Sequence, residues 1–233
     1  MKGGKLIVIE GTDCSGKFTQ LNLLTERLKS LPSAVASFDF PNYDSPTGKV
    51  VRMHIDGEFG LASEFSPKVS AVFFAEDRFA SKGFIIDELE KGNIVVLDRY
   101  VESNMANQGG KFGDISEREK FFDWVDKLEH ENFGLPRPDM VIFLHVPYEV
   151  SRELIMNRKK KSDFHAGEEG GRDAYEKCSS YLKNAEETYL HLARLRGWIV
   201  VDCAPDGTIG SLKTSSEVHD EIWEKVNRFL CTV

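Results

Sequence analysis

The chain has 233 residues, of which 41% are hydrophobic and 29% charged, a composition typical of a soluble globular protein. Its longest apolar runs, such as residues 94–97, are far too short to span a bilayer, which argues against a membrane protein. A net charge of -8 argues against wrapping a nucleic acid, but it is compatible with a small phosphorylated ligand held by a few local cations.

Short apolar runs alternate with amphipathic stretches along the whole chain. The runs predict strands at residues 6–9, 35–38, 94–97, 140–144 and 199–201, and each is continuous, as in strands covered on both faces. The amphipathic stretches predict helices at residues 20–31, 67–91, 116–131, 150–157, 173–196 and 217–230. This alternation predicts one α/β domain over residues 1–233, a three-layer sandwich with a five-stranded parallel sheet between helices. Ligands of such sheets bind beyond the carboxyl ends of the strands.

A glycine-bounded loop follows the first predicted strand. Gly11, Gly16 and Lys17 match the Gly-x-x-x-x-Gly-Lys pattern of a phosphate-binding loop (P-loop), although a plain turn between a strand and a helix is the alternative. Glycines let successive amides face phosphate oxygens, the next helix adds its positive end, and Lys17 would reach the β- and γ-phosphates. The loop therefore predicts an ATP site made of Gly11, Thr12, Asp13, Cys14, Ser15, Gly16, Lys17, Phe18 and Thr19.

The metal side of this loop departs from the pattern. The residue after the lysine is normally a Ser or Thr that ligates Mg²⁺, but here it is Phe18, and Thr19 comes one position late. Magnesium keeps several waters and needs only one or two carboxylates. Asp98 ends the third predicted strand, where a P-loop enzyme places its metal-holding aspartate, so we expect it to hold Mg²⁺. A strand-end salt bridge is the alternative.

Further polar and aromatic residues follow the other strands. Phe74 and Arg78 lie four apart on one face of a predicted helix, although Phe74 could be a core residue and Arg78 could pair with Glu76 or Asp77. Residues 158–172 have no apolar periodicity and several glycines, which predicts a lid over the site. The remaining candidates on this side are Phe40, Tyr43, Arg99, Ser103 and Gln108.

Taken together, these motifs resemble the thymidylate kinase family. The resemblance runs from residue 7 to about residue 192 and rests on the P-loop, Phe40-Pro41, Phe74 with Arg78, and Asp98-Arg99-Tyr100 with Gln108-Gly109. It implies transfer of the γ-phosphate of ATP to dTMP, which gives dTDP and ADP for dTTP synthesis. It also implies Mg²⁺ as cofactor and a homodimer.

The resemblance also implies a role for each matching residue. Asp13 would hold the 3′-hydroxyl of dTMP, Phe74 would stack on thymine, and Arg78 would read a thymine carbonyl. Arg99 would grip the acceptor phosphate, and Gln108 would contact the base. The expected acceptor site is Asp13, Phe40, Tyr43, Phe74, Arg78, Arg99, Ser103 and Gln108, and the expected catalytic residues are Lys17, Arg99, Arg158 and Asp13.

Two departures from the family pattern keep other functions open. Some members have a P-loop arginine where this chain has Cys14, so Arg158 of the lid is the first candidate for the missing cation. Many members have an arginine where this chain has Tyr43. One alternative is a kinase of the same fold for another nucleotide or a deoxynucleoside. The other is a nucleotide-binding regulator without catalysis, motivated by Cys14 and Phe18.

The remaining expectations concern location and the C-terminus. Four widely spaced cysteines without a Cys-x-x-Cys pair, and no visible signal peptide, fit a reducing cytoplasm. The apolar stripe of the last predicted helix, residues 217–230, could be core or interface, and core is the expected answer.

Overall fold

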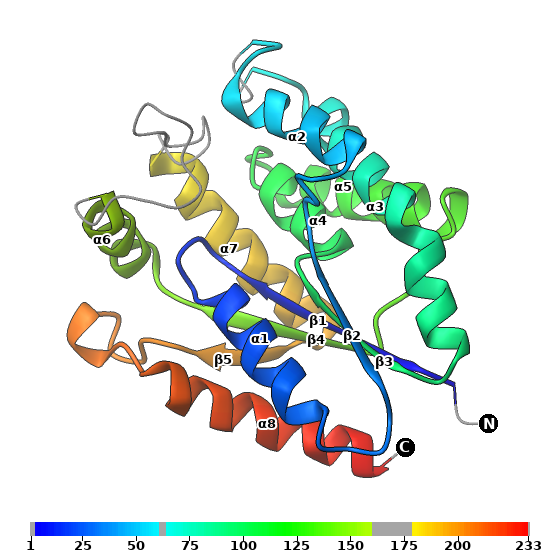
Figure 1. Cartoon of the computed structure of the whole chain (residues 1–233). Coiled ribbons are helices and arrows are strands. Elements are labelled where there is room, and N and C mark those ends of the chain that lie inside the picture. Colours follow the sequence, from blue (N-terminus) through cyan, green and yellow to red (C-terminus); the bar gives the residue numbers. More distant parts are fainter. Residues whose placement is uncertain (1–2, 61–63, 160–178, 233) are drawn as a thin grey trace.

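The computed structural model describes residues 3–60, 64–159 and 179–232. Its five strands form one parallel sheet in the order β2-β3-β1-β4-β5 (Figure 1). All five expected strands are present, with bounds β1 Lys5–Gly11, β2 Val35–Asp39, β3 Ile94–Asp98, β4 Met140–His145 and β5 Ile199–Asp202. The predicted α/β class and the parallel five-stranded sheet are therefore confirmed.

Helices cover both faces of this sheet. The described residues form α1 Lys17–Leu28, α2 Pro46–Asp56, α3 Pro67–Glu90, α4 Val101–Gly109, α5 Ile115–Asp126, α6 Tyr148–Lys159, α7 Ser179–Arg196 and α8 Ser215–Thr232, with a π-helical turn Lys127–Asn132 and a 3₁₀ turn Ile209–Ser211. Sequence patterns missed α2 and α4 and started the first helix three residues late. The expected start of the fifth helix and the predicted lid lie mostly outside the described residues.

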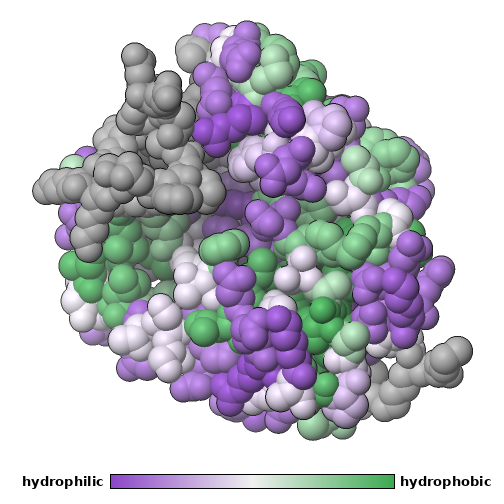
Figure 2. All heavy atoms as spheres, in the orientation of Figure 1, coloured by the Kyte–Doolittle hydropathy of each residue, from purple (hydrophilic) through white to green (hydrophobic). Residues whose placement is uncertain are grey.

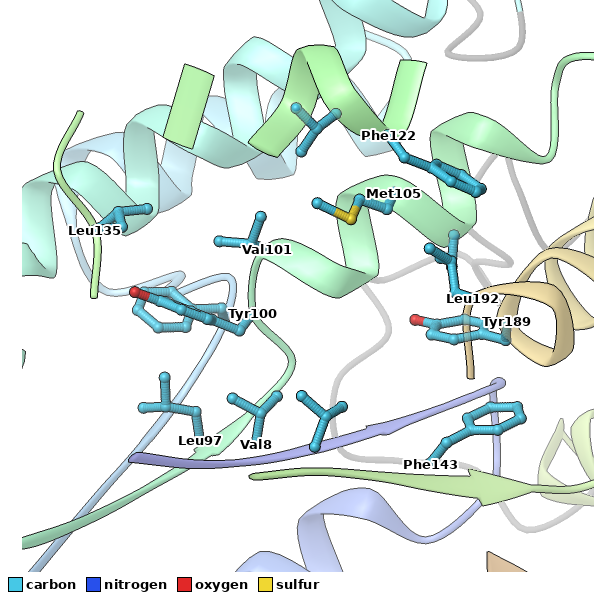
Figure 3. Packing of buried hydrophobic residues seen from close by; sticks show 14 of the residues in the cluster. Val8, Leu97, Tyr100, Val101, Met105, Phe122, Leu135, Phe143, Tyr189 and Leu192 are labelled. Atoms are coloured by element: carbon cyan, nitrogen blue, oxygen red, sulfur yellow. The ribbon is translucent and has the colours of Figure 1, made fainter. Parts of the chain in front are cut away.

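Two apolar clusters hold the three layers together. One joins the sheet to α3, α4, α5 and α7, and it includes Val8, Tyr100 and Phe143 (Figure 3). The other joins the opposite face to α1 and α8, and it includes Val218, Ile222 and Val226, which confirms that the C-terminal stripe is core. The prediction of burial on both faces holds for β1, β3 and β4. It is wrong for β2 and β5, which are edge strands with exposed positions such as Val200.

Local signals in the sequence fix several helix starts. Ser45 accepts a hydrogen bond from the Gly48 amide at the start of α2, and Asp114 does the same for Glu117 at the start of α5. Pro67 occupies the first position of α3, where a missing amide hydrogen costs nothing. In the parts of the chain that the structure describes, no helix is long and apolar enough to cross a membrane.

Candidate active site

The P-loop joins the end of β1 to the start of α1 at the carboxyl edge of the sheet. Gly16 has φ of 83°, in the left-handed region that favours glycine, and it directly precedes α1. A Cβ on Gly11 would collide with the Ser15 side chain and come within 3.0 Å of the Leu144 carbonyl oxygen, so a larger residue would force this turn to shift. The buried Lys17 Nζ donates to the carbonyls of Gly11 at 3.1 Å and Thr12 at 2.9 Å.

Charges of both signs meet behind this loop. Burial lowers the pKa of Lys17, and the nearby Arg99 charge lowers it further, while Asp98 and Asp13 act in the opposite direction. Burial raises the pKa of the Asp98 carboxyl, and Asp39 on the neighbouring strand adds to this, while Lys17 and Arg99 lower it. Asp98 Oδ1 is buried and has no hydrogen-bond partner among the described residues. An added cation or its water would therefore find an acceptor there.

A magnesium ion at this place would depend mostly on groups other than protein side chains. Phe18 is 61% exposed and has no oxygen that could ligate an ion, and Thr19 is exposed one position further along α1. Within residues 3–60, 64–159 and 179–232, no group of three or more His, Cys, Asp or Glu side chains is placed to hold a metal. The residues present fit an ion that is held by Asp98, by waters and by nucleotide phosphates.

A cavity of about 110 Å³ opens beside the P-loop, between the sheet edge and helices α2, α3 and α4. Figure 2 shows a hollow with hydrophilic residues below α2. All eight residues expected on the acceptor side line this cavity, although they come from separate parts of the chain. Its lining consists of Asp13, Phe40, Pro41, Tyr43, Ile55, Phe74, Asp77, Arg78, Arg99, Ser103, Asn104, Asn107, Gln108 and Tyr181.

Arg78 is held in place by a partner that sequence reasoning did not suggest. Its Nε and Nη2 donate to the two carboxylate oxygens of Glu129, at 2.6 and 2.7 Å, and both side chains are almost fully buried. The suggested pairing with Glu76 or Asp77 is therefore wrong. Asn104 Nδ2 donates to the same carboxylate at 2.8 Å. The bidentate pair fixes the guanidinium plane at the cavity wall, with Nη1 not engaged by Glu129.

Arg99 and Asp13 meet at the mouth of the cavity. Arg99 Nη2 donates to Asp13 Oδ1 at 2.8 Å, and both side chains are partly exposed. Arg99 has φ of 65°, an uncommon conformation for a residue other than glycine. The salt bridge suggested as an alternative for this strand end therefore exists, but it joins Arg99 to Asp13 and not to Asp98.

The other expected acceptor residues differ in their hydrogen bonds, exposure and packing. Gln108 is buried, and its Oε1 has no partner among the described residues, which makes it available to a ligand. The Ser103 hydroxyl donates to Glu10 at 2.7 Å. Tyr43 is 41% exposed, and the Arg52 guanidinium lies 5.4 Å from its ring centre. Phe74 is partly buried against Val51 and Ile55, so it is both a packing residue and a cavity wall.

Sequence reasoning did not name Ile55, Asp77, Asn104 or Tyr181 as site residues, although all four line the cavity. Asp77 accepts hydrogen bonds from the Asn42 amide and from the hydroxyls of Ser45 and Thr47, which shapes the loop after β2. A polar residue on a helix gives no signal of such distant partners. Arg158 lies in the last turns of α6, but its side chain and residues 160–178 lie outside the described part of the chain.

Comparison with known proteins adds to this geometry. The family model of thymidylate kinase matches residues 9–208. The chain belongs to the thymidylate kinase family. The thymidylate kinase of Plasmodium falciparum is 29% identical over 97% of this chain and 91% of that protein. That of Mycobacterium tuberculosis is 33% identical over 83% and 87%, and a probable thymidylate kinase of Pyrococcus horikoshii is 34% identical over 94% of each.

A solved structure shows the same fold. The thymidylate kinase of Candida albicans superposes with a TM-score of 0.71 at 23% identity, covering 97% of this chain and 92% of that one. At this identity, the structural similarity shows that the two proteins share the arrangement of the sheet and helices. The resemblance expected from the motifs is thus confirmed, and the chain is a P-loop kinase of the thymidylate kinase family.

Proposed function

We propose that this chain transfers the γ-phosphate of ATP to dTMP, giving dTDP and ADP. The observation that carries the proposal is the cavity in which Phe74, Arg78, Arg99 and Gln108 meet next to the P-loop. An aromatic ring, two guanidinium groups and a buried amide match a pyrimidine base at one end and a phosphate at the other.

The P-loop is the ATP side of this proposal. Main-chain amides of residues 11–17 and the positive end of α1 bind the phosphates, and Lys17 bonds the β- and γ-phosphates. Asp98 would hold magnesium through water, and the ion would supply positive charge near the transferred phosphoryl group. Neither Phe18 nor Thr19 would be needed as a ligand, since ATP phosphates and waters would fill the remaining positions.

The cavity is the acceptor side. Arg99 binds the dTMP phosphate, for which a planar guanidinium offers two parallel donors. Asp13 accepts a hydrogen bond from Arg99 and also holds the 3′-hydroxyl of dTMP. Phe74 stacks on the thymine ring. Arg78 donates to a thymine carbonyl through Nη1, the nitrogen that does not bond Glu129. Gln108 contacts the base edge through its unpartnered Oε1. Phe40, Tyr43 and Ser103 complete the walls.

Phosphoryl transfer requires alignment of the two substrates and stabilisation of negative charge, and it does not require a strong base. The acceptor phosphate is already ionised at neutral pH, so its oxygen attacks directly once it is aligned. Lys17 and Arg99 stabilise the charge that develops in the transition state. The proposal also includes Arg158 as a further cation for the transfer step and residues 158–172 as a lid over the site. Both belong to a single domain of residues 1–233.

The proposal also includes a homodimer in the cytoplasm. Supporting the dimer, α3 carries large apolar side chains that are 42–50% exposed, namely Val69, Val72, Phe79 and Phe84. Sedimentation at micromolar concentration tests this part, and a monomer that persists at all concentrations would contradict it.

The activity is tested by following a labelled phosphate from ATP to the acceptor. With ATP labelled at the γ-phosphate, magnesium and a panel of nucleoside monophosphates and deoxynucleosides, label should appear in dTDP with the highest kcat/KM for dTMP. Preferred labelling of another acceptor would reject dTMP as the substrate. ATP binding without transfer to any acceptor would instead indicate a regulator.

A further inference from the structure

Glu10 is a buried carboxyl group that the proposed mechanism does not use. It lies on β1 immediately before the P-loop, it is 0% exposed, and burial raises its pKa. A buried carboxyl group is costly unless its oxygens are hydrogen-bonded, so its bonds indicate what it is for.

Three donors converge on this one group. Glu10 Oε1 accepts from the Tyr100 amide at 2.8 Å. Glu10 Oε2 accepts from the Ser103 hydroxyl at 2.7 Å and from the Tyr189 hydroxyl at 2.9 Å. Tyr100 and Ser103 lie at the start of α4, whereas Tyr189 lies on α7, with its ring stacked on Phe143 of β4. Glu10 therefore joins β1 to two helices that flank the cavity.

The Tyr100 bond acts on the backbone of Arg99. Arg99 has φ of 65°, a conformation that a residue with a side chain rarely adopts, and such conformations persist only where neighbouring bonds hold them. Its own amide donates to the Ile9 carbonyl at 3.0 Å, and the next amide, that of Tyr100, donates to Glu10. Consecutive residues of β1 thus hold the peptides on both sides of Arg99.

We propose that Glu10 is a positioning residue that holds Arg99 in its left-handed conformation and so aims the guanidinium at the acceptor phosphate. The Tyr189 hydroxyl contributes to this positioning, because its hydrogen bond from α7 holds the Glu10 carboxyl group in place. The inference rests on the proposed function, since it names what sets the geometry of the phosphate clamp.

The test uses two ligands that differ only in the phosphate. Binding of dTMP and of thymidine is measured by calorimetry for the wild type, Glu10→Gln and Tyr189→Phe. If Glu10 acts through Arg99, dTMP affinity should fall about tenfold or more in Glu10→Gln, because the loss of charge-assisted hydrogen bonds to the phosphate has an effect of this size. Thymidine has no phosphate, so its affinity should stay within about twofold. Tyr189→Phe should show a smaller change in the same direction.

Two controls separate positioning from a general loss of structure. Thr188→Val removes a buried hydroxyl that donates to the Asn184 carbonyl within α7, at 2.6 Å, next to Tyr189 but without contact to Glu10. It should leave the ratio of the two affinities unchanged. In an Arg99→Ala background, Glu10→Gln should have no further effect on dTMP binding, because residues that act through one another are not additive.

Each outcome bears on one claim. Equal weakening of dTMP and thymidine in Glu10→Gln, or an undiminished effect in the Arg99→Ala background, would overturn the positioning role even if the wild type phosphorylates dTMP normally. A wild type that binds neither ligand would instead reject the proposed function.

Discussion

At the scale of single residues, Lys17 combines burial with a charge. Its ammonium group donates to two carbonyls of its own loop, and burial lowers its pKa. Charged phosphate oxygens are stronger acceptors than these carbonyls, so a triphosphate in the loop would take over the ammonium group. Lys17 is therefore placed to act on the phosphates without a change in the loop.

Replacing Lys17 by methionine keeps the volume of the side chain and removes its charge. Turnover of dTMP should fall by about 10²–10³, the range seen when one preorganised donor to the transition state is lost. Steady-state kinetics check this, with thermal unfolding as the control for folding. Near-normal turnover in a folded variant would show that Lys17 does not contact the moving phosphoryl group.

Phe18 offers a second residue-scale prediction. Phe18→Ser restores a hydroxyl directly after the lysine, where P-loops ligate magnesium. Because Phe18 is 61% exposed, the exchange should not disturb the core. The Mg²⁺ concentration for half-maximal rate should fall, and Thr19→Ser serves as the matched control, with no change expected. An unchanged magnesium dependence in Phe18→Ser would mean that a hydroxyl at position 18 does not reach the ion.

At the scale of elements, α4 shows where sequence patterns fail. Most of its residues are buried, including the polar Glu102, Ser103, Asn104 and Gln108, because one side packs on the core and the other lines the cavity. A helix buried in this way has no apolar stripe, so no period of 3.6 residues could reveal it. The five strands, by contrast, were predictable because each is a run of β-branched or apolar residues.

The Arg78–Glu129 pair ties α3 to the π-helical turn after α5, and Asn104 joins it from α4. Glu129→Gln would leave the Arg78 charge buried without a counter-charge, so the free energy of unfolding should fall by about 3–5 kcal/mol. Urea unfolding measures it. Glu224→Gln breaks the exposed Arg228–Glu224 pair and should cost less than about 1 kcal/mol. Similar losses in both variants would contradict the structural weight given to the buried pair.

At the scale of the whole molecule, the buried carboxyl groups make stability depend on pH. Burial, with the Glu10 charge as the next cause, raises the pKa of Glu102 from its usual value of 4.5 to about 8. The folded state therefore holds a proton that the unfolded state has released at intermediate pH. Stability from this group is full below about pH 4.5 and is lost as the pH rises toward about 8.

Glu102→Gln isolates this effect, because an amide mimics the protonated acid at every pH. The difference in free energy of unfolding between Glu102→Gln and wild type should be small at pH 4.5 and should grow in favour of the variant by a few kcal/mol by pH 8. Denaturant unfolding across this range measures the difference. A constant difference at all pH values would show that Glu102 is ionised in the folded protein.

The assembly of the site is also a property of the whole molecule. Strand order brings Gly11, Asp39 and Asp98 to one sheet edge, which the rule for parallel sheets predicted. The acceptor side was predictable only through family resemblance. Contacts such as Arg78 with Glu129, and Glu10 with Tyr189, join residues far apart in the chain and leave no local pattern.

A crystal structure with a non-hydrolysable ATP analogue, Mg²⁺ and dTMP tests the central claim most directly. We expect the triphosphate along residues 11–17 with Lys17 at its β- and γ-phosphates, the dTMP phosphate on Arg99, and thymine against Phe74. A triphosphate bound away from this loop, or thymine outside the cavity, would contradict the account.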